Sequence, residues 1–100
     1  MPSNKNYNQL RATSTKRATS FDPAVARAFA EVIRRERVQR EIAQDQFALL
    51  ANVDRSYYGK LERGERQPSL VLLLRIAKAL ELTGAELVAK VEVAQTATNR

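Results

Sequence analysis

The stretch "NVDRSYYGKLERGERQPSL", residues 52–70, is the most informative part of this chain about its fold. It holds two of the three glycines and two of the three tyrosines, but its apolar residues are too sparse for a core strand. Asp54 can cap a helix over residues 55–63, because its carboxylate accepts hydrogen bonds from backbone N–H groups and favours the positive helix end. Gly64 then falls where a helix often ends in a left-handed residue. The stretch therefore predicts a short charged helix that ends in a loop.

A second helix is predicted over residues 44–51, only a few residues before the first. Two helices joined so closely must meet at a steep angle, which is the geometry of a helix-turn-helix. Asn52 lies in the turn, where a left-handed conformation is commonly required, and Asn tolerates it better than most residues other than Gly. The pair therefore predicts a helix-turn-helix.

Three further helices complete the pattern. Asp22 is a good N-cap and Pro23 suits the first helical position, so a helix is predicted over residues 23–38. Ser69 caps another helix that runs to about residue 80. The sequence "TGAE" at 83–86 matches a capping box and opens the last helix. In the helix after Ser69 we expect a broad buried stripe made of Leu70, Leu73, Leu74, Ala77 and Leu80.

No part of the chain shows the alternating pattern of a strand, so an all-α domain of five helices is predicted. The domain covers residues 21–94. Residues 1–20 are polar and basic without apolar periodicity, and we expect a flexible tail there. Residues 95–100 are expected to fray.

The net charge and the absence of Cys and His limit the functions that this chain can have. The formal net charge is +6, from 17 Lys and Arg against 11 Asp and Glu. A basic chain favours anionic partners, nucleic acid first, although solubility alone is the alternative reading. There is no Cys and no His, which excludes disulfides, thiolate or imidazole metal ligands and His-based catalysis. Carboxylates could still bind a hard cation or act as acid and base, but no pair of them falls in a recognisable loop motif. We therefore expect no catalytic residue, no metal site, no cofactor and no enzymatic activity.

No segment has the length and apolar character of a membrane span or a signal peptide. The longest strongly apolar run stops at Arg75. We therefore expect a cytoplasmic protein with no membrane partner.

The predicted helix over residues 55–63 has two unlike sides. Tyr58 and Leu61 point inward. The opposite side carries the charges of Arg55, Lys60 and Arg63, the hydroxyl of Ser56, and a gap at Gly59, which has no side chain. Such a face suits major-groove edges and phosphates. The alternative is a solvated helix that happens to be basic. An exposed helical Gly costs about 1 kcal/mol relative to Ala, which argues weakly against that alternative.

From Phe29 to Leu82 the chain resembles the Cro/C1-type (XRE family) helix-turn-helix regulators. The matching motifs keep the family's order and spacing: "IRRER" at 33–37, "NVDRSYYGKLERG" at 52–64 and "LLRIAKAL" at 73–80. The resemblance implies a lambda-repressor-like fold and a transcriptional regulator that binds double-stranded DNA.

The resemblance also implies roles by position. Base edges would be read by Arg55, Ser56 and Lys60. Phosphates would be bound by Gln44, Tyr57, Arg63 and Arg66. An internal salt bridge would join Arg37 and Glu62, since a buried charge needs its partner.

Several residues depart from the family pattern. Ala43 stands where relatives often carry a capping Ser or Thr, so that helix end should be weaker by roughly 0.5–2 kcal/mol. Tyr58 replaces a customary aliphatic residue, and its hydroxyl needs a partner. Leu49 and Leu50 stand where relatives often have polar groups; we expect at least one of them in the core, and an exposed patch for a partner is the alternative.

The last predicted helix supplies a candidate dimer interface, because Leu87, Val88 and Val91 exceed what one small core obviously needs. The alternative is that all three pack within the monomer. The leading hypothesis is a sequence-specific regulator that binds a palindromic operator as a homodimer, with half-sites about 34 Å apart. A protein-interaction module or antitoxin, an RNA-binding protein, and a controller protein of a restriction–modification system stay open.

Overall fold

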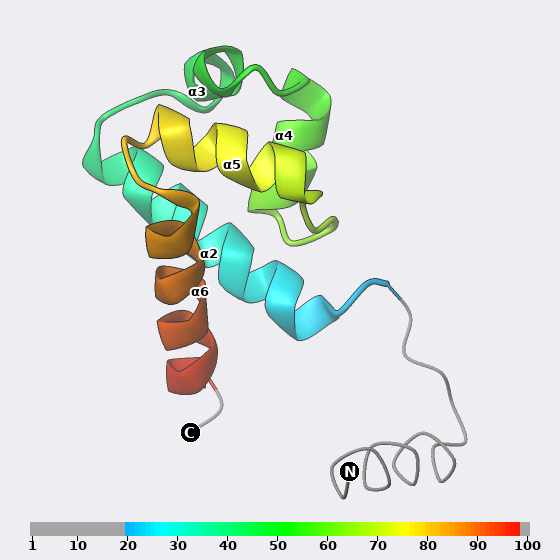
Figure 1. Ribbon diagram of the computed structural model, residues 1–100. Helices are drawn as coiled ribbons and strands as arrows, with labels where there is room; N and C mark the ends of the chain where they lie inside the picture. Colours follow the sequence, from blue (N-terminus) through cyan, green and yellow to red (C-terminus); the bar gives the residue numbers. More distant parts are fainter. Residues whose placement is uncertain (1–19, 99–100) are drawn as a thin grey trace, which may run out of the picture.

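The computed structural model describes residues 20–98, and these form five helices without a strand (Figure 1). The all-α prediction is confirmed. The bounds of the helices are α2 (Pro23–Gln39), α3 (Gln44–Ala51), α4 (Arg55–Glu62), α5 (Leu70–Ala79) and α6 (Gly84–Thr98). Apart from Ser20, the predicted basic tail lies outside the described residues.

Local signals set the beginnings of these helices as predicted. Asp22 and Asp54 each accept backbone N–H groups at the starts of α2 and α4, at 2.9 and 3.0 Å, and Ser69 does the same for α5 at 3.2 Å. The Thr83 N–H donates to Glu86 Oε1 at 2.8 Å, while the Glu86 N–H donates to Thr83 Oγ1 at 3.0 Å. This reciprocal pair is the predicted capping box.

Left-handed residues reverse the chain after the helices. Asn52 (φ 56°) and Gly64 (φ 74°) adopt this conformation, as predicted. Glu41 (φ 56°) and Glu81 (φ 61°) also adopt it, which the sequence did not indicate. Each of these two follows a final helical turn, where a left-handed residue lets the next N–H group return to a helix carbonyl.

The core lies where α2 packs against α4 and α6, and where α5 packs against α3 and α6. Its largest fully buried side chains include Tyr58, Phe47, Ile33, Leu61 and Ile76. In Figure 1, α3 and α4 lie at one end of the molecule next to α5, and α6 runs from α5 down past α2.

An ion cluster around the buried carboxylate of Glu36 joins α2 to α6. The Glu36 side chain is 8% exposed, and it pairs with Arg40 at 2.8 Å and with Lys90 at 3.4 Å. Burial by itself raises the pKa of Glu36, but the hydrogen bonds and charges of Arg40 and Lys90 outweigh it, so the pKa is lowered. The carboxylate therefore stays charged and links the two helices.

Two predictions about buried leucines are wrong. Of the stripe predicted after Ser69, Ala77 and the C-capping residue Leu80 are buried and Leu73 is half-buried, but Leu70 and Leu74 are 72% and 48% exposed. They lie one turn apart, so they share a ridge on α5 that its neighbours α3 and α6 cover only in part.

The other wrong prediction concerns α3. Leu49 and Leu50 are 81% and 60% exposed, so neither joins the core. Three other residues of this helix, Phe47, Ala48 and Ala51, already fill its inward side.

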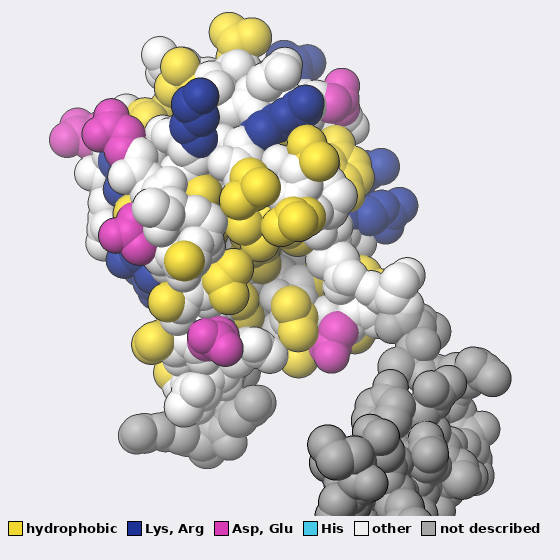
Figure 2. Space-filling view, in the orientation of Figure 1, with side chains coloured by type: hydrophobic (Ala, Val, Ile, Leu, Met, Phe, Trp, Pro, Cys, Tyr) yellow, Lys and Arg dark blue, Asp and Glu magenta, His cyan; other side chains and the backbone are white. Residues whose placement is uncertain are grey.

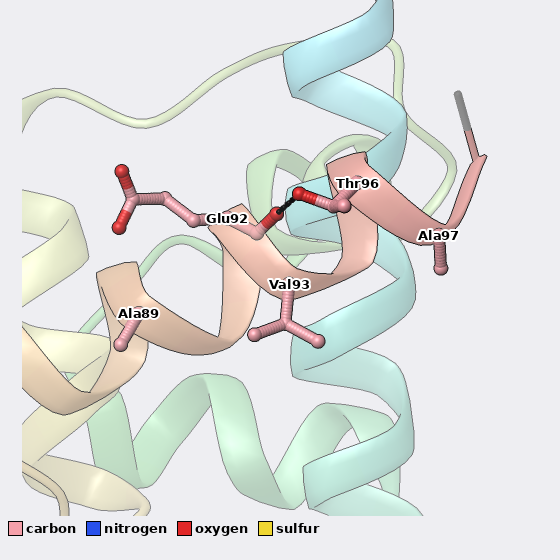
Figure 3. A pocket seen from close by; sticks show the side chains of 5 residues that line it. All are labelled: Ala89, Glu92, Val93, Thr96 and Ala97. Atoms are coloured by element: carbon pink, nitrogen blue, oxygen red, sulfur yellow. Dashed lines mark hydrogen bonds between the residues drawn. The ribbon is translucent and has the colours of Figure 1, made fainter. Parts of the chain in front are cut away.

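Helix α6 differs from its prediction in two ways. It extends to Thr98, so residues 95–98 are helical instead of frayed. It packs against α2, with Ala94 buried, and Thr96 Oγ1 donates to the Glu92 carbonyl at 3.0 Å (Figure 3). The extension follows from this packing, because a neighbouring helix supplies the tertiary contacts that stabilise a helix end.

The second difference concerns the candidate dimer interface. Leu87 and Val91 are buried in the core, so their assignment to an interface is wrong. Both point toward the other helices because they lie one turn apart on the inward side of α6. Of the three residues, Val88 alone is exposed, at 41%.

Candidate nucleic-acid interface

The turn between α3 and α4 is fixed by contacts between the two helices and by a hydrogen bond from α5. The Phe47 and Tyr58 rings, one from each helix, have centroids 5.3 Å apart. The buried Val53 donates its N–H to the Ala48 carbonyl at 2.9 Å, and Arg75 of α5 donates to the Asn52 carbonyl at 3.2 Å. The angle between the two helices is therefore fixed by a packed core and not by the loop alone.

Glu62 is the hub of a buried polar cluster that joins three helices. Its carboxylate, 3% exposed, accepts from Arg37 Nε at 2.6 Å and from Arg37 Nη2 at 2.9 Å. Tyr58 Oη donates to it at 2.5 Å and Gln44 Nε2 at 3.0 Å. Four donors thus cover the two oxygens of a carboxylate, which makes the buried charge tolerable.

The contacts within this cluster keep Glu62 and Arg37 charged and Tyr58 protonated. Burial by itself raises the pKa of Glu62, but the hydrogen bonds from Arg37, Tyr58 and Gln44 outweigh it, so the pKa is lowered. The hydrogen bond to Glu62 raises the pKa of Arg37. Burial and the same carboxylate raise the pKa of Tyr58, so its hydroxyl stays protonated and remains a donor.

The three candidate base-reading residues lie on the outer side of α4. The Arg55 side chain is 74% exposed, Ser56 is exposed and Lys60 is half-buried. Arg55 Nη1 lies 3.3 Å from Asp45 Oδ2, at the second residue of α3. The sequence did not indicate this ion pair, because its members are ten residues apart on different helices.

Gly59 lies in the middle of the same side, but it is buried and not the open gap expected from the sequence. A Cβ atom placed on it would lie 3.2 Å from Arg63 Nη1 and 3.9 Å from Gln44 Oε1. The missing side chain therefore leaves space for the end of the Arg63 side chain, while Gln44 would be in ordinary contact with an added Cβ.

The four candidate phosphate-binding residues flank this side of α4. Gln44 is the first residue of α3, which has no side-chain cap, as Ala43 predicted. Tyr57 Oη donates to the Gln67 carbonyl at 3.3 Å. Arg63 Nε lies 2.8 Å from Glu65 Oε2, and Arg66 donates to the Glu65 carbonyl at 3.0 Å. Glu65 was not among the residues indicated by the sequence, and its carboxylate lowers the net charge beside Arg63.

The arrangement offers hydrogen-bond donors and positive charge on a protruding helix. Figure 2 shows Lys and Arg side chains along the edge of the molecule where Figure 1 shows α4. Among residues 20–98, no cluster of acidic side chains could hold a metal ion, and no helix is long and apolar enough to cross a membrane. Such a surface suits the edges and phosphates of a nucleic acid.

Comparison with known proteins identifies similarity to helix-turn-helix proteins. The model of the helix-turn-helix family HTH_3 matches residues 33–87, which include all of α3, α4 and α5. The control protein C.MunI of a Mycoplasma species is 38% identical over 52 residues, which are 52% of this chain and 70% of that protein.

Solved structures of restriction–modification controller proteins are also similar to this chain. The restriction–modification controller protein C.AhdI from Aeromonas hydrophila is 39% identical, with a TM-score of 0.59 over 62% of this chain and 94% of its own. The controller protein C.Esp1396I, a tetramer in complex with its natural 35 base-pair operator, is 24% identical and shares the fold. Its TM-score is 0.66 over 72% of this chain and 95% of its own.

Proposed function

Because the chain belongs to the HTH_3 helix-turn-helix family of DNA-binding transcriptional regulators, we propose that it recognises a specific operator as a homodimer. The observation that carries the proposal is the two-sided character of α4. Its inner side is anchored by Tyr58, Leu61 and the Glu62 cluster, while Arg55 and Ser56 face outward. A helix held this rigidly can present its outer side chains to base edges in the major groove.

In this proposal α4 enters the major groove and α3 crosses the backbone above it. Arg55 donates to O6 and N7 of a guanine, and Ser56 and Lys60 contact neighbouring base edges. The N-terminal residue of α3, Gln44, contacts a phosphate, and Tyr57, Arg63 and Arg66 flank the backbone. These contacts position the protein, while Arg55, Ser56 and Lys60 specify the sequence.

One short helix reads only a few base pairs, which is why a dimer on a palindrome is proposed, with half-sites about 34 Å apart. The proposed interface is the apolar ridge of Leu70 and Leu74 on α5, continued by Val88 on α6. A Cβ atom on Gly84 would lie 2.5 Å from Leu74 Cδ2, so the first turn of α6 directly adjoins Leu74. Val88 lies one turn further along, and Figure 2 shows hydrophobic side chains gathered over this region.

Among sequence-specific DNA-binding regulators, we propose that this protein is a controller protein of a restriction–modification system. The support is the similarity to C.MunI and C.AhdI, at 38% and 39% identity. Methyltransferase and endonuclease genes beside the gene for this chain would support this subtype, and their absence would oppose it.

The decisive experiment is selection of bound sequences from random duplex DNA. The affinity for the selected sequence is then compared with that for scrambled DNA across a salt series. We expect a palindromic sequence, with discrimination in the range typical of specific regulators, about 10³-fold or more. Arg55→Ala should reduce discrimination at one base pair of each half-site by about 1–3 kcal/mol. Weak binding that ignores sequence and disappears with salt would refute specific recognition.

The dimer has its own test by sedimentation equilibrium. Leu74→Lys should shift the protein to a monomer, because it places a charge in the proposed interface. The matched control is Leu49→Lys, which changes an exposed leucine on α3 and should leave the dimer intact. A monomeric wild-type protein, or equal effects of the two variants, would refute this interface.

A further inference from the structure

Asp45 stands beside the residue on which base recognition is proposed to depend. Asp45 Oδ2 lies 3.3 Å from Arg55 Nη1, and the two side chains are 64% and 74% exposed. They come from the first turns of α3 and α4, so the pair bridges the two helices at the DNA-facing end of the motif.

Asp45 stabilises the protein only modestly: it lies in the first turn of α3, where a negative charge favours the positive helix end, and this effect does not require Arg55. An ion pair between two such exposed side chains contributes little to folding, because water and salt screen it. Its negative charge also repels phosphates, which lowers the affinity of the surface for any DNA. The contact with Arg55 is therefore the feature of Asp45 that bears on DNA recognition.

A guanidinium group has five N–H donors in a rigid planar fork. When Nη1 is engaged by Asp45, the donors on Nε and Nη2 remain for a second acceptor. A guanine offers two acceptors, O6 and N7, on its major-groove edge. A phosphate can be contacted from many directions, so a free Arg55 could reach the backbone at any sequence.

We propose that Asp45 is a specificity-determining residue, which orients Arg55 toward a guanine and withholds it from phosphates at other sequences. This inference rests on the proposed function, in which Arg55 reads a base. Orienting the side chain before binding also reduces the entropy lost when it docks. At a sequence without the guanine, Arg55 stays paired with Asp45 and adds nothing to binding.

The test is a comparison of operator duplexes that differ only at the base pair assigned to Arg55, at fixed salt. Asp45→Asn keeps the size of the side chain but removes its charge. Discrimination at this base pair should fall by roughly fivefold or more, a substantial part of what one bidentate contact supplies. The loss should arise mainly from tighter binding of the substituted duplex. In the background of Arg55→Ala, Asp45→Asn should cause no further loss.

Glu65→Gln is the matched control, because Glu65 pairs with Arg63, a proposed phosphate contact, at 2.8 Å. It should strengthen binding to every duplex by the same factor and leave discrimination unchanged. If Arg55→Ala loses discrimination but Asp45→Asn keeps it, or behaves like Glu65→Gln, the role of Asp45 is refuted while the proposed function stands. If the wild-type protein does not discriminate, or Arg55→Ala discriminates normally, base reading by Arg55 and the role of Asp45 both fail.

Discussion

Removing the Tyr58 hydroxyl would test whether the Glu62 cluster holds the helix-turn-helix together. Tyr58→Phe keeps the ring that packs on Phe47 and deletes the buried donor 2.5 Å from Glu62. A hydrogen bond to a charged group contributes about 1.5–3 kcal/mol. Arg37 still donates to the same oxygen at 2.6 Å, so the carboxylate keeps a partner. We therefore expect the free energy of unfolding to fall by about 1.5–3 kcal/mol, measured by urea denaturation.

The neighbouring tyrosine supplies the control. Tyr57→Phe removes a hydroxyl that is 3.3 Å from the neutral Gln67 carbonyl, so it should cost less than about 1 kcal/mol. For Tyr58→Phe the loss should also depend on pH. The pKa of Glu62 is lowered in the folded state, partly by Tyr58, so the associated stability is present above the unfolded pKa and disappears as pH falls through the folded one. Equal losses for the two variants, or a Tyr58→Phe deficit that persists unchanged in acid, would refute this account.

Three further predictions concern stability. Gly64→Ala should lower the free energy of unfolding by about 1–2 kcal/mol, because Gly64 has φ 74° and an added Cβ would lie 3.3 Å from Arg27 Cγ; no change in urea denaturation would contradict it. Glu36→Gln should lower the melting temperature near neutral pH, with a deficit that shrinks in acid, because the lowered pKa of Glu36 means that its stabilisation is lost as pH falls through the folded value. Leu49→Ser should change stability by less than about 0.5 kcal/mol, since the side chain is 81% exposed; a larger loss on thermal melting would place Leu49 in a packed contact.

Helix positions and turns could be predicted because the interactions that set them are local. Asp54 caps its helix through a residue three positions away, and Thr83 and Glu86 do the same for α6. The left-handed residues Asn52 and Gly64 follow from backbone preference. The motifs of residues 33–80 likewise indicated the family, because each is a run of adjacent residues whose order and spacing are visible in the chain itself.

The ion pair and the polar cluster around the site depended on tertiary structure. Asp45 meets Arg55 across ten residues, and Gln44 meets Glu62 across eighteen, because the angle between α3 and α4 brings them together. Spacing along the chain does not encode such an angle. It follows from the packing of Phe47 against Tyr58 and of α5 behind the turn.

Burial of the apolar residues was also decided by the fold. The spacing of apolar residues predicts which sides of α3, α5 and α6 are apolar, but not how much of each side the neighbouring helices cover. A domain of this size has too few helices to bury every leucine. Where the apolar side of a helix is wider than its contact with neighbouring helices, the residues at its edge stay exposed to solvent. The packing of α6 against α2 and α5 places Leu87 and Val91 inside, while Leu49 and Leu74 stay exposed because the contacts between helices cover only part of α3 and α5.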